Sequence, residues 1–298
     1  MPDLEGRIFK IDDNTLTLTK KVGSGDLCDC YEGTFVDNRP PVHKPGATDW
    51  EILIEDDEGT IRDVFIKVAE DTSNNDLIEN EVSKLNRIFP LGAKEEGFLR
   101  YLPQSLGTFE VAGKRAHVLS RIDGHISLAQ IIKEYPAGID YRDLAWMFKR
   151  SLEGIGFAHK HKITHGALLP EHILVHPTGH GAKLVDWSYS VEINTPLRAI
   201  VGGYRTYYPS EVFDRRPCTF TLDIFMLGKI CIKMLGGIPD TNEIPDTVPL
   251  PFRKLLLDMV HAERNMRPSN AWDLHEEFDQ VLRDLVGKPT YRPWPPAA

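Results

Sequence analysis

Short runs in which apolar and polar residues alternate dominate the first part of the chain. The clearest are LTLTKKV, CDCYEGTFV and WEILIEDDEGTIRDVFIKV, and SLGTFEV and RAHVLSRI follow further on. This period is typical of half-buried β-strands, and residues 57–59 (DEG) have the composition of a hairpin turn. The pattern predicts an antiparallel sheet near the N-terminus.

One segment within this region has helical spacing instead. Residues 75–88 (NDLIENEVSKLNRI) place apolar side chains three and four positions apart, and Asn74 or Asn75 can cap the segment. The members of this stripe are Leu77, Ile78, Val82, Leu85 and Ile88. We therefore expect a single helix beside the sheet.

Helical patterns prevail after Asp123 and Gly124. Residues 141–160 carry an apolar stripe, and residues 222–235 are apolar on nearly every side, which indicates a buried helix. A strand, turn and strand in HILVHPTGHGAKLVDW interrupts this helical part.

These patterns predict an α+β fold with two lobes. Residues 1–122 should form a five-stranded sheet with one helix, and a loop rich in proline and glycine should be inserted at about 37–62. Residues 123–290 should form a larger helical lobe, followed by a proline-rich tail at 291–298. We expect the functional site in the cleft between the lobes.

Composition and charge narrow the functional classes. The chain has 298 residues, of which 41% are apolar and 27% charged, as in ordinary globular proteins. A net charge of −9 without any basic run argues against a nucleic-acid partner. No signal-peptide pattern opens the chain and no long apolar stretch follows, so we expect a soluble, cytoplasmic protein without membrane contact.

The four cysteines fit neither a disulfide framework nor a paired zinc motif, so we expect reduced thiols. Cys28 and Cys30 could bind a metal only with ligands from elsewhere, and small residues on a strand are the simpler interpretation. The tail TYRPWPPAA is either a proline-type recognition segment or a frayed or surface-packed terminus, and we favour the latter.

A glycine-rich stretch is the first candidate for chemistry. In VGSGDLCDCYEG, Gly23 and Gly25 occupy the first two positions of a GxGxxG pattern, and Cys28 stands at the third. Glycines there let backbone amides approach phosphate groups, although a glycine-rich hairpin turn can have the same sequence pattern.

The order of the motifs that follow resembles the protein kinase family. VFIK ends at Lys67 on a predicted strand, and Glu81 lies on the helix that follows. In that family the strand lysine holds nucleotide phosphates and pairs with the helix glutamate. The resemblance implies these roles for Lys67 and Glu81; otherwise they are a surface lysine and a solvated glutamate.

Further motifs extend the resemblance from about Leu16 to Leu285. ITHGALLPEHILV looks like the catalytic loop, and KLVDWS looks like the metal-binding DFG segment, which makes Asp186 the metal-binding aspartate. His165, Glu211, Asp223 and Arg267 match architectural residues of the family. The nucleotide-binding residues that the resemblance implies are Gly23, Gly25, Lys67, Glu81, Leu119, Leu174 and Asp186.

The catalytic loop departs from the family where chemistry is performed. Ala167 stands in place of the aspartate that receives or orients the substrate proton, and Leu169 replaces a lysine that stabilises the phosphoryl group. His172 replaces the asparagine that holds the second magnesium ion. Gly166 replaces the arginine that would bind a phosphorylated activation segment.

Two positions leave open whether the chain binds a nucleotide. Phe65 stands where a small residue would face the adenine ring, so its ring either fills that slot or rotates and stacks on the base. His172 beside Asp186 would give a mixed nitrogen and oxygen site that favours Mn²⁺ or Zn²⁺ over Mg²⁺, unless it is only a packed or exposed loop histidine.

These departures predict a pseudokinase that acts as an interaction or regulatory scaffold for a protein partner. The alternative is an ATP-binding, kinase-like enzyme with Mg²⁺ or Mn²⁺ and an unorthodox phosphotransfer or nucleotidyl-transfer mechanism, which would use Lys67 and Asp186. A third possibility is a nucleotide sensor without turnover.

Overall fold

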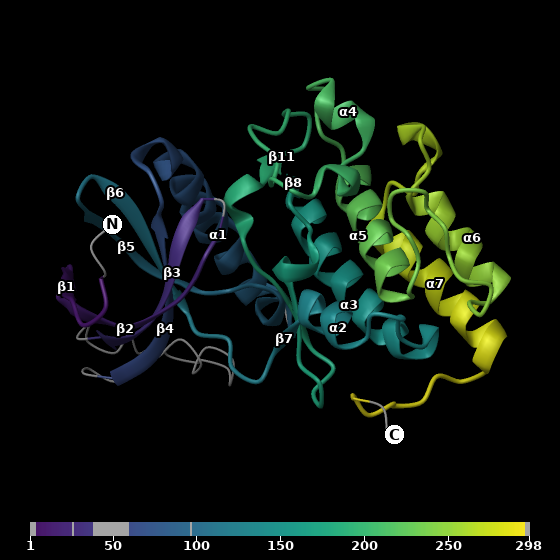
Figure 1. Cartoon of the computed structure of the whole chain (residues 1–298), viewed down its shortest axis with the longest axis horizontal. Helices are drawn as coiled ribbons and strands as arrows, with labels where there is room; N and C mark the ends of the chain where they lie inside the picture. The colour runs from purple at the N-terminus through teal and green to yellow at the C-terminus, as the bar shows by residue number, and fades with distance from the viewer. Residues whose placement is uncertain (1–3, 26, 38–59, 96, 296–298) are drawn as a thin grey trace. The chain divides into compact units, whose positions relative to one another are not determined.

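The computed structural model describes residues 4–25, 27–37, 60–95 and 97–295. It divides into two compact units, the first comprising residues up to 99 with 103–123, and the second comprising 100–102 with the chain from 124 onward. The predicted turn at 57–59 and most of the predicted inserted loop lie outside the described residues. Figure 1 labels most of the helices and strands of both units.

The first unit is built on an antiparallel sheet in the order β1-β2-β3-β4-β6-β5. Its strands are β1 (Ile8–Ile11), β2 (Asn14–Ser24), β3 (Cys28–Asp37), β4 (Thr60–Ala69), β5 (Ser105–Val111) and β6 (Lys114–Ser120). The described sheet has six strands, so the expectation of five was wrong. The additional strand β1 has four residues, too few to show a period, and its pairing with β2 defines it.

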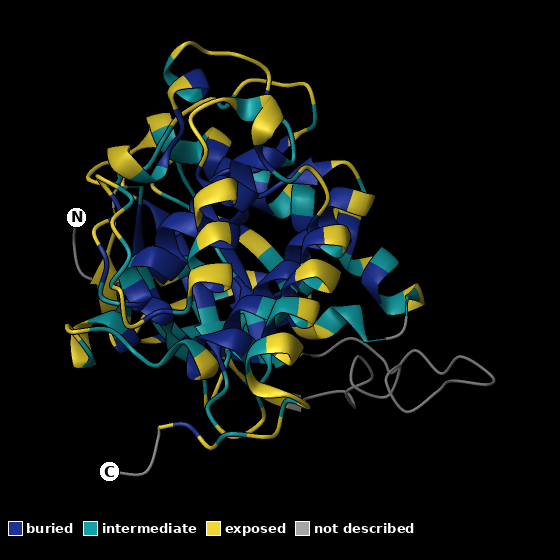
Figure 2. Cartoon of the chain, turned by 90° about the vertical axis from the view of Figure 1, so that its right-hand side faces the viewer, coloured by how far each residue is buried: buried dark blue, intermediate teal, exposed yellow. Residues whose placement is uncertain are grey.

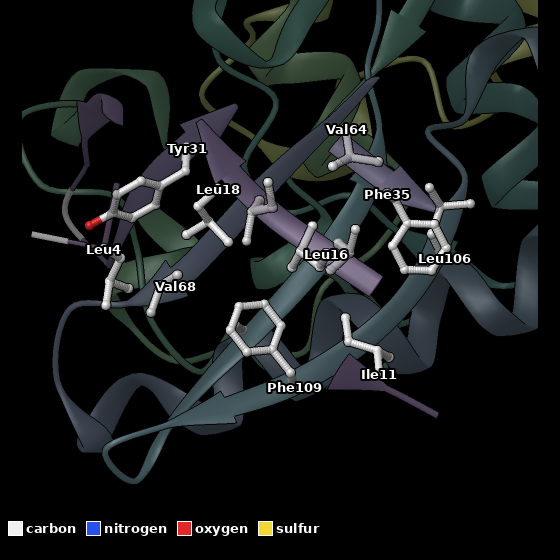
Figure 3. Close-up of a cluster of buried hydrophobic side chains, with 13 residues drawn as sticks. Leu4, Ile11, Leu16, Leu18, Tyr31, Phe35, Val64, Val68, Leu106 and Phe109 are labelled. Atoms are coloured by element: carbon white, nitrogen blue, oxygen red, sulfur yellow. The ribbon is translucent and has the colours of Figure 1, made fainter. Parts of the chain in front are cut away.

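One face of this sheet forms the apolar core of the first unit. Alternate residues of the strands point to this side, and Figure 3 shows side chains from β1 to β5 gathered there. The buried members are Leu4, Ile11, Leu16, Leu18, Tyr31, Phe35, Val64, Ile66, Val68, Leu106, Phe109, Ala116 and Val118. Because Val64, Ile66 and Val68 take this face, the alternate residues of β4 point to the other.

Helix α1 (Asn75–Lys94) follows β4 and belongs to the same unit. It confirms the predicted helix and extends it by six residues, from 88 to 94, because Pro90 is accommodated inside the helix. Ile78 packs with Cys28 and Ala69, which lie on the face of the sheet opposite the main core. The helix thereby covers the sheet face that carries Lys67.

The second unit is mainly helical, as expected. Its helices are α2 (Leu128–Glu134), α3 (Tyr141–Lys160), α4 (Ser210–Phe213), α5 (Thr221–Met234), α6 (Leu250–Met259) and α7 (Ala271–Val286). Figure 2 shows exposed residues on the outward faces of the surface helices and buried residues beneath them. By contrast, thirteen of the fourteen residues of α5 are buried, which confirms the all-round apolar pattern predicted for it.

Short strands and 3-10 turns complete the second unit. β7 (Ile126–Ser127), β9 (Ile173–Val175) and β10 (Ala182–Leu184) form one small sheet, and β8 (Ile163–Thr164) pairs with β11 (Val191–Glu192). In the described residues of both units, the 3-10 turns are Thr72–Asn74, Phe98–Tyr101, Pro170–His172, Trp187–Tyr189, Arg205–Tyr207 and Arg264–Met266. The hairpin β9–β10 carries the DFG-like segment at its end.

A buried ion pair joins α4 to the segment before α7. Arg267 donates to both carboxylate oxygens of Glu211 at 2.5 and 3.2 Å and also donates to two backbone carbonyl oxygens. Removing one partner of such a pair leaves a buried charge, which is costly.

No helix in the described residues is long and apolar enough to cross a membrane.

Candidate functional site

The glycine-rich stretch joins β2 to β3. Gly23 lies in β2 beside an irregularity in the pairing with β3, and the Gly25 amide donates to the Cys28 carbonyl oxygen at 2.9 Å. Cys28 is buried against α1, with its sulfur 3.8 Å from that of Cys30. The third glycine position therefore contributes a packed side chain.

Lys67 and Glu81 form a buried ion pair within the first unit. The Lys67 ammonium lies 3.2 Å from Oε1 and 3.1 Å from Oε2 of Glu81, and neither residue is more than 5% exposed. The strand lysine and the helix glutamate thus meet as the sequence predicted. This geometry is the arrangement expected for a phosphate-binding lysine held in position.

His117 adds a further partner that sequence reasoning missed. Its Nδ1 lies 3.1 Å from Glu81 Oε2, and its Nε2 lies 2.9 Å from the Ser105 hydroxyl. The ring is fully buried on β6, where His117 is directly opposite Lys67 on β4. Only the pairing of β4 with β6 reveals this contact, because a lone histidine in a strand carries no specific signal.

Phe65 and Leu119 are paired across β4 and β6, two residues from Lys67 along the strand. Since side chains alternate along a strand, Phe65 and Leu119 point to the same face of the sheet as Lys67. Leu119 is 6% exposed and Phe65 is half-buried. A benzyl group thus lies on the face of the sheet that carries Lys67.

The catalytic-loop positions belong to the second unit. Ala167 and Leu169 are 0% and 1% exposed, so both substituted positions are packed into the interior. Gly166 has φ +78°, and a Cβ there would lie 2.7 Å from the Tyr189 carbonyl oxygen. Glycine therefore fits this backbone without strain.

Asp223 at the start of α5 holds the loop in shape. Its fully buried carboxylate accepts from the amides of His165 and Gly166 at 2.8 and 3.0 Å and contacts the His159 ring at 2.8 Å. Burial acts to raise the pKa of Asp223, but these hydrogen bonds outweigh it and lower the pKa. Burial also lowers the pKa of His165 to about 4.

His172 and Asp186 lie side by side in the same unit. His172 Nδ1 is 2.7 Å from the Ala167 carbonyl oxygen, and Nε2 is 3.2 Å from Asp186 Oδ2. A carbonyl oxygen only accepts, so Nδ1 carries a hydrogen and Nε2 faces the carboxylate. Asp186 itself has left-handed backbone geometry, with φ 61°.

This geometry fits two ligands of one cation. Ligands about 2.0–2.2 Å from a metal ion lie roughly 3 Å apart, and a ligating histidine commonly donates its other ring hydrogen to a backbone carbonyl. The same contact is also satisfied by a protonated ring paired with Asp186. In the part of the chain that is described, no group of three or more potential metal-ligating side chains occurs.

Trp187 and Ser188 replace the phenylalanine and glycine of the DFG segment. Trp187 is completely buried and donates its indole hydrogen to the Leu184 carbonyl oxygen at 2.9 Å. The preceding strand is also anchored, because Lys183 donates to the Leu102 carbonyl oxygen and burial lowers the pKa of Lys183 to about 8. Leu174 on β9 is half-buried and pairs with Lys183 on β10.

Comparison with known proteins agrees with this geometry. The protein kinase domain family matches residues 104–290, which is more than half of the chain. The chain belongs to the protein kinase family. The match includes the catalytic-loop and DFG-like segments, whereas the segments with Gly23, Lys67 and Glu81 precede it.

Individual relatives are protein kinases of several kinds. Probable serine/threonine-protein kinase irlA of Dictyostelium discoideum is 34% identical over 134 residues, 38% of this chain and 9% of that protein. Aurora kinase A-A of Xenopus laevis is 30% identical over 95 residues, 32% of this chain and 23% of that protein. Serine/threonine-protein kinase H2 of Homo sapiens is 24% identical over 216 residues, 65% of this chain and 52% of that protein. The chain thus spans at most about half the length of these relatives.

The two residue pairs stand at positions that have defined roles in protein kinases. Protein kinases bind ATP with magnesium through the strand lysine, the DFG aspartate and the catalytic-loop asparagine. The structure brings Lys67 to Glu81 within the first unit and His172 to Asp186 within the second. The proton-accepting aspartate of this family has no counterpart at position 167.

Proposed function

We propose that this kinase-family chain is a pseudokinase that serves as an interaction or regulatory scaffold for a protein partner. The observation that carries the proposal is the packing of Ala167 and Leu169 into the interior. Neither side chain can accept a proton or stabilise a phosphoryl group. Loss of a general base alone commonly costs about 10²- to 10⁴-fold in rate.

The neighbouring acidic residue gives no substitute for the missing aspartate. Glu171 is exposed, and its carboxylate accepts a hydrogen bond from the Tyr204 hydroxyl. Glu171 therefore contacts the segment between the DFG-like residues and α4. We infer that it does not act as the general base.

The scaffold itself is well supported by buried contacts. Glu81 is held by His117 as well as Lys67, and Glu211 is held by Arg267, all by protein groups. Such contacts maintain the fold whether or not the protein catalyses phosphotransfer, and a scaffold requires only the fold. The net charge of −9 favours a protein over a nucleic acid as partner, and we include a cytoplasmic location in the proposal.

A phosphorylation assay tests this proposal. Purified chain is incubated with labelled ATP and general acceptor proteins such as casein, in Mg²⁺ and separately in Mn²⁺. We expect no more incorporation into chain or acceptor than with the Asp186→Ala variant. Incorporation at about 1 s⁻¹ or faster, within the usual range for kinases, would overturn the scaffold proposal.

A nucleotide-dependent enzyme of unorthodox mechanism is the second candidate. The observation in its favour is the pairing of His172 with Asp186 at 3.2 Å, a geometry suited to one cation. A bound Mn²⁺ would be held by these two side chains and would neutralise phosphate charge. Turnover that is equal in wild type, Lys67→Ala and Asp186→Ala would exclude this candidate.

A further inference from the structure

Residues 288–295 follow α7 and fold back over the second unit. We call this segment the strap; it has no helix or strand, and in Figure 1 it is the yellow trace that leaves α7 and passes beneath α2. Three of its side chains, those of Tyr291, Arg292 and Trp294, make separate contacts with the unit. The strap is therefore held by side chains rather than by a backbone ladder.

The central contact is a two-pronged ion pair. Arg292 donates from Nε to Asp143 Oδ1 at 2.5 Å and from Nη2 to Oδ2 at 3.1 Å. The Asp143 side chain is only 3% exposed, and within the described part of the chain Arg292 is the only hydrogen-bonding partner of this carboxylate. A buried carboxylate requires a partner, and the paired oxygens match the planar fork of an arginine.

Aromatic rings flank this ion pair on one side. The Trp146 ring stacks on the His180 ring with centroids 4.0 Å apart and planes 4° apart, and Tyr291 stacks on the outer face of His180 at 4.5 Å. The Tyr291 hydroxyl also donates to the Thr178 carbonyl oxygen at 3.1 Å. The turn between β9 and β10 and helix α3 together form this platform.

Trp294, two residues further along the strap, is buried. It is 4% exposed, and its ring lies 5.2 Å from that of Tyr135 at the end of α2. Tyrosine, arginine and tryptophan are the side chains that most often dominate binding at protein interfaces. The strap carries one residue of each type within four positions, and its arginine meets the buried carboxylate of Asp143.

We propose that the face formed by Tyr135, Asp143, Trp146 and residues 176–180 is a docking site for an extended peptide in which an arginine lies between two aromatic residues. The strap is the resident occupant of this site, and a partner protein that carries such a segment displaces it. The proposal rests on the scaffold function for its purpose. The site's binding chemistry does not depend on phosphotransfer.

Peptide binding to the full chain tests the proposal. The probe is a fluorescent peptide with the sequence KPTYRPWP, and binding is followed by anisotropy. In a variant with Arg292→Ala and Trp294→Ala the strap is weakened, and we expect the peptide to bind it at least tenfold more tightly than wild type. The reason is that the attached strap competes at a high effective concentration in the wild type.

Two matched controls make the result specific. Asp143→Asn added to the strap variant removes the countercharge with little change in shape, and a peptide with its arginine replaced by glutamine removes the partner charge. Either change should weaken peptide binding at least tenfold. Circular dichroism and thermal unfolding establish that each variant is folded, and amide exchange of the first turns of α3 in the strap variant, without and with excess peptide, reports occupation of the site.

Several outcomes would overturn the proposal. They are absence of peptide binding to the strap variant, equal binding after Asp143→Asn, and unchanged exchange of α3 with peptide. A concentration-dependent dimer formed by exchange of straps would assign the site to a second copy and also overturn it. Because these measurements omit ATP, their failure leaves the phosphorylation test of the scaffold function untouched.

Discussion

The backbone at Gly166 accounts for the residue found there. Its φ of +78° is a conformation that other residues adopt only with strain, and an added Cβ would meet Tyr189 and Leu197 at 2.7 and 2.8 Å. Asp223 fixes this conformation by accepting from the Gly166 amide. Gly166, which stands where kinases have an arginine, thus adopts this backbone conformation without strain and is closely packed.

Gly166 and Gly203 have nearly the same φ but different surroundings. Gly203 has φ +77°, and a Cβ there would have nothing within 4 Å. Gly203→Ala should therefore cost only about 1–2 kcal/mol of backbone strain. Gly166→Ala should cost about 1–3 kcal/mol more because of crowding, measured by urea unfolding. Equal losses would show that packing at position 166 is loose.

Glu153 on α3 supports a prediction about pH. Burial acts to raise the pKa of its carboxyl, but contacts with His275, Tyr101 and Arg150 outweigh burial and lower the pKa to about 2. A carboxyl whose pKa is lower in the folded state contributes stability above its ordinary pKa of 4.5, and this contribution is lost as pH falls toward 2.

Glu153→Gln should remove this contribution. A pKa lowered from 4.5 to about 2 corresponds to about 3.4 kcal/mol, and we expect about half because the side chain is partly exposed to solvent. The difference in melting temperature between wild type and variant should therefore shrink as pH falls from 6 to 3. Tyr101→Phe, which removes one of the contacts, should produce a smaller effect. A constant difference across this range would contradict the assignment.

At the scale of elements, α1 is fastened to the sheet through Glu81. Lys67 on β4 and His117 on β6 both contact the Glu81 carboxylate, and Ser105 on β5 contacts the far side of the His117 ring. β4 and β6 thus both contact Glu81 of α1, and β5 is linked to it through His117. The position of α1 on the sheet follows from contacts within the first unit.

His117→Leu should loosen α1. The substitution leaves Glu81 and Ser105 without their shared partner, which should cost about 1–3 kcal/mol and speed amide exchange around residues 77–85. Ser105→Ala is the matched control, since it removes only the outer hydrogen bond and should cost about 0.5–1.5 kcal/mol. Exchange of α3 should be unaffected in both. Equal acceleration of α1 and α3 would indicate general destabilisation instead.

At the scale of the whole molecule, nucleotide binding depends on whether Phe65 leaves room for a base. Phe65 lies on the same face of the sheet as Lys67, and we propose that its ring fills the adenine slot. The wild type should then show no thermal shift with millimolar ATP in Mg²⁺ or Mn²⁺. Phe65→Ala should gain a metal-dependent shift, and Lys67→Ala in that background should abolish it.

The size of the shift makes this test quantitative. Ligand at about 100 times its dissociation constant adds about 2.7 kcal/mol to stability. A shift in the wild type that is abolished by Lys67→Ala would show that the ring stacks on the base instead of filling the slot. That result would favour the nucleotide-dependent alternative over a pure scaffold.

Prediction from sequence succeeded where the signal is local. The extents of α3 and α5 were recognised to within a residue at each end, because apolar side chains three and four apart report the buried face of a helix directly. Strand β1 was missed because four residues are too few for a period. The pairs of Lys67 with Glu81 and of Glu211 with Arg267 were expected from the family resemblance, and both are formed.

The sequence by itself determined the family resemblance, the order of the elements and the absence of an acidic group at Ala167. Only the tertiary structure decided that His117 contacts Glu81, that His172 faces Asp186 and that Arg292 reaches Asp143. The first set depends on residue identity and on short-range periodicity. The second set depends on how strands, turns and helices pack, and Arg292 and Asp143 are 149 positions apart, beyond the range of any local pattern.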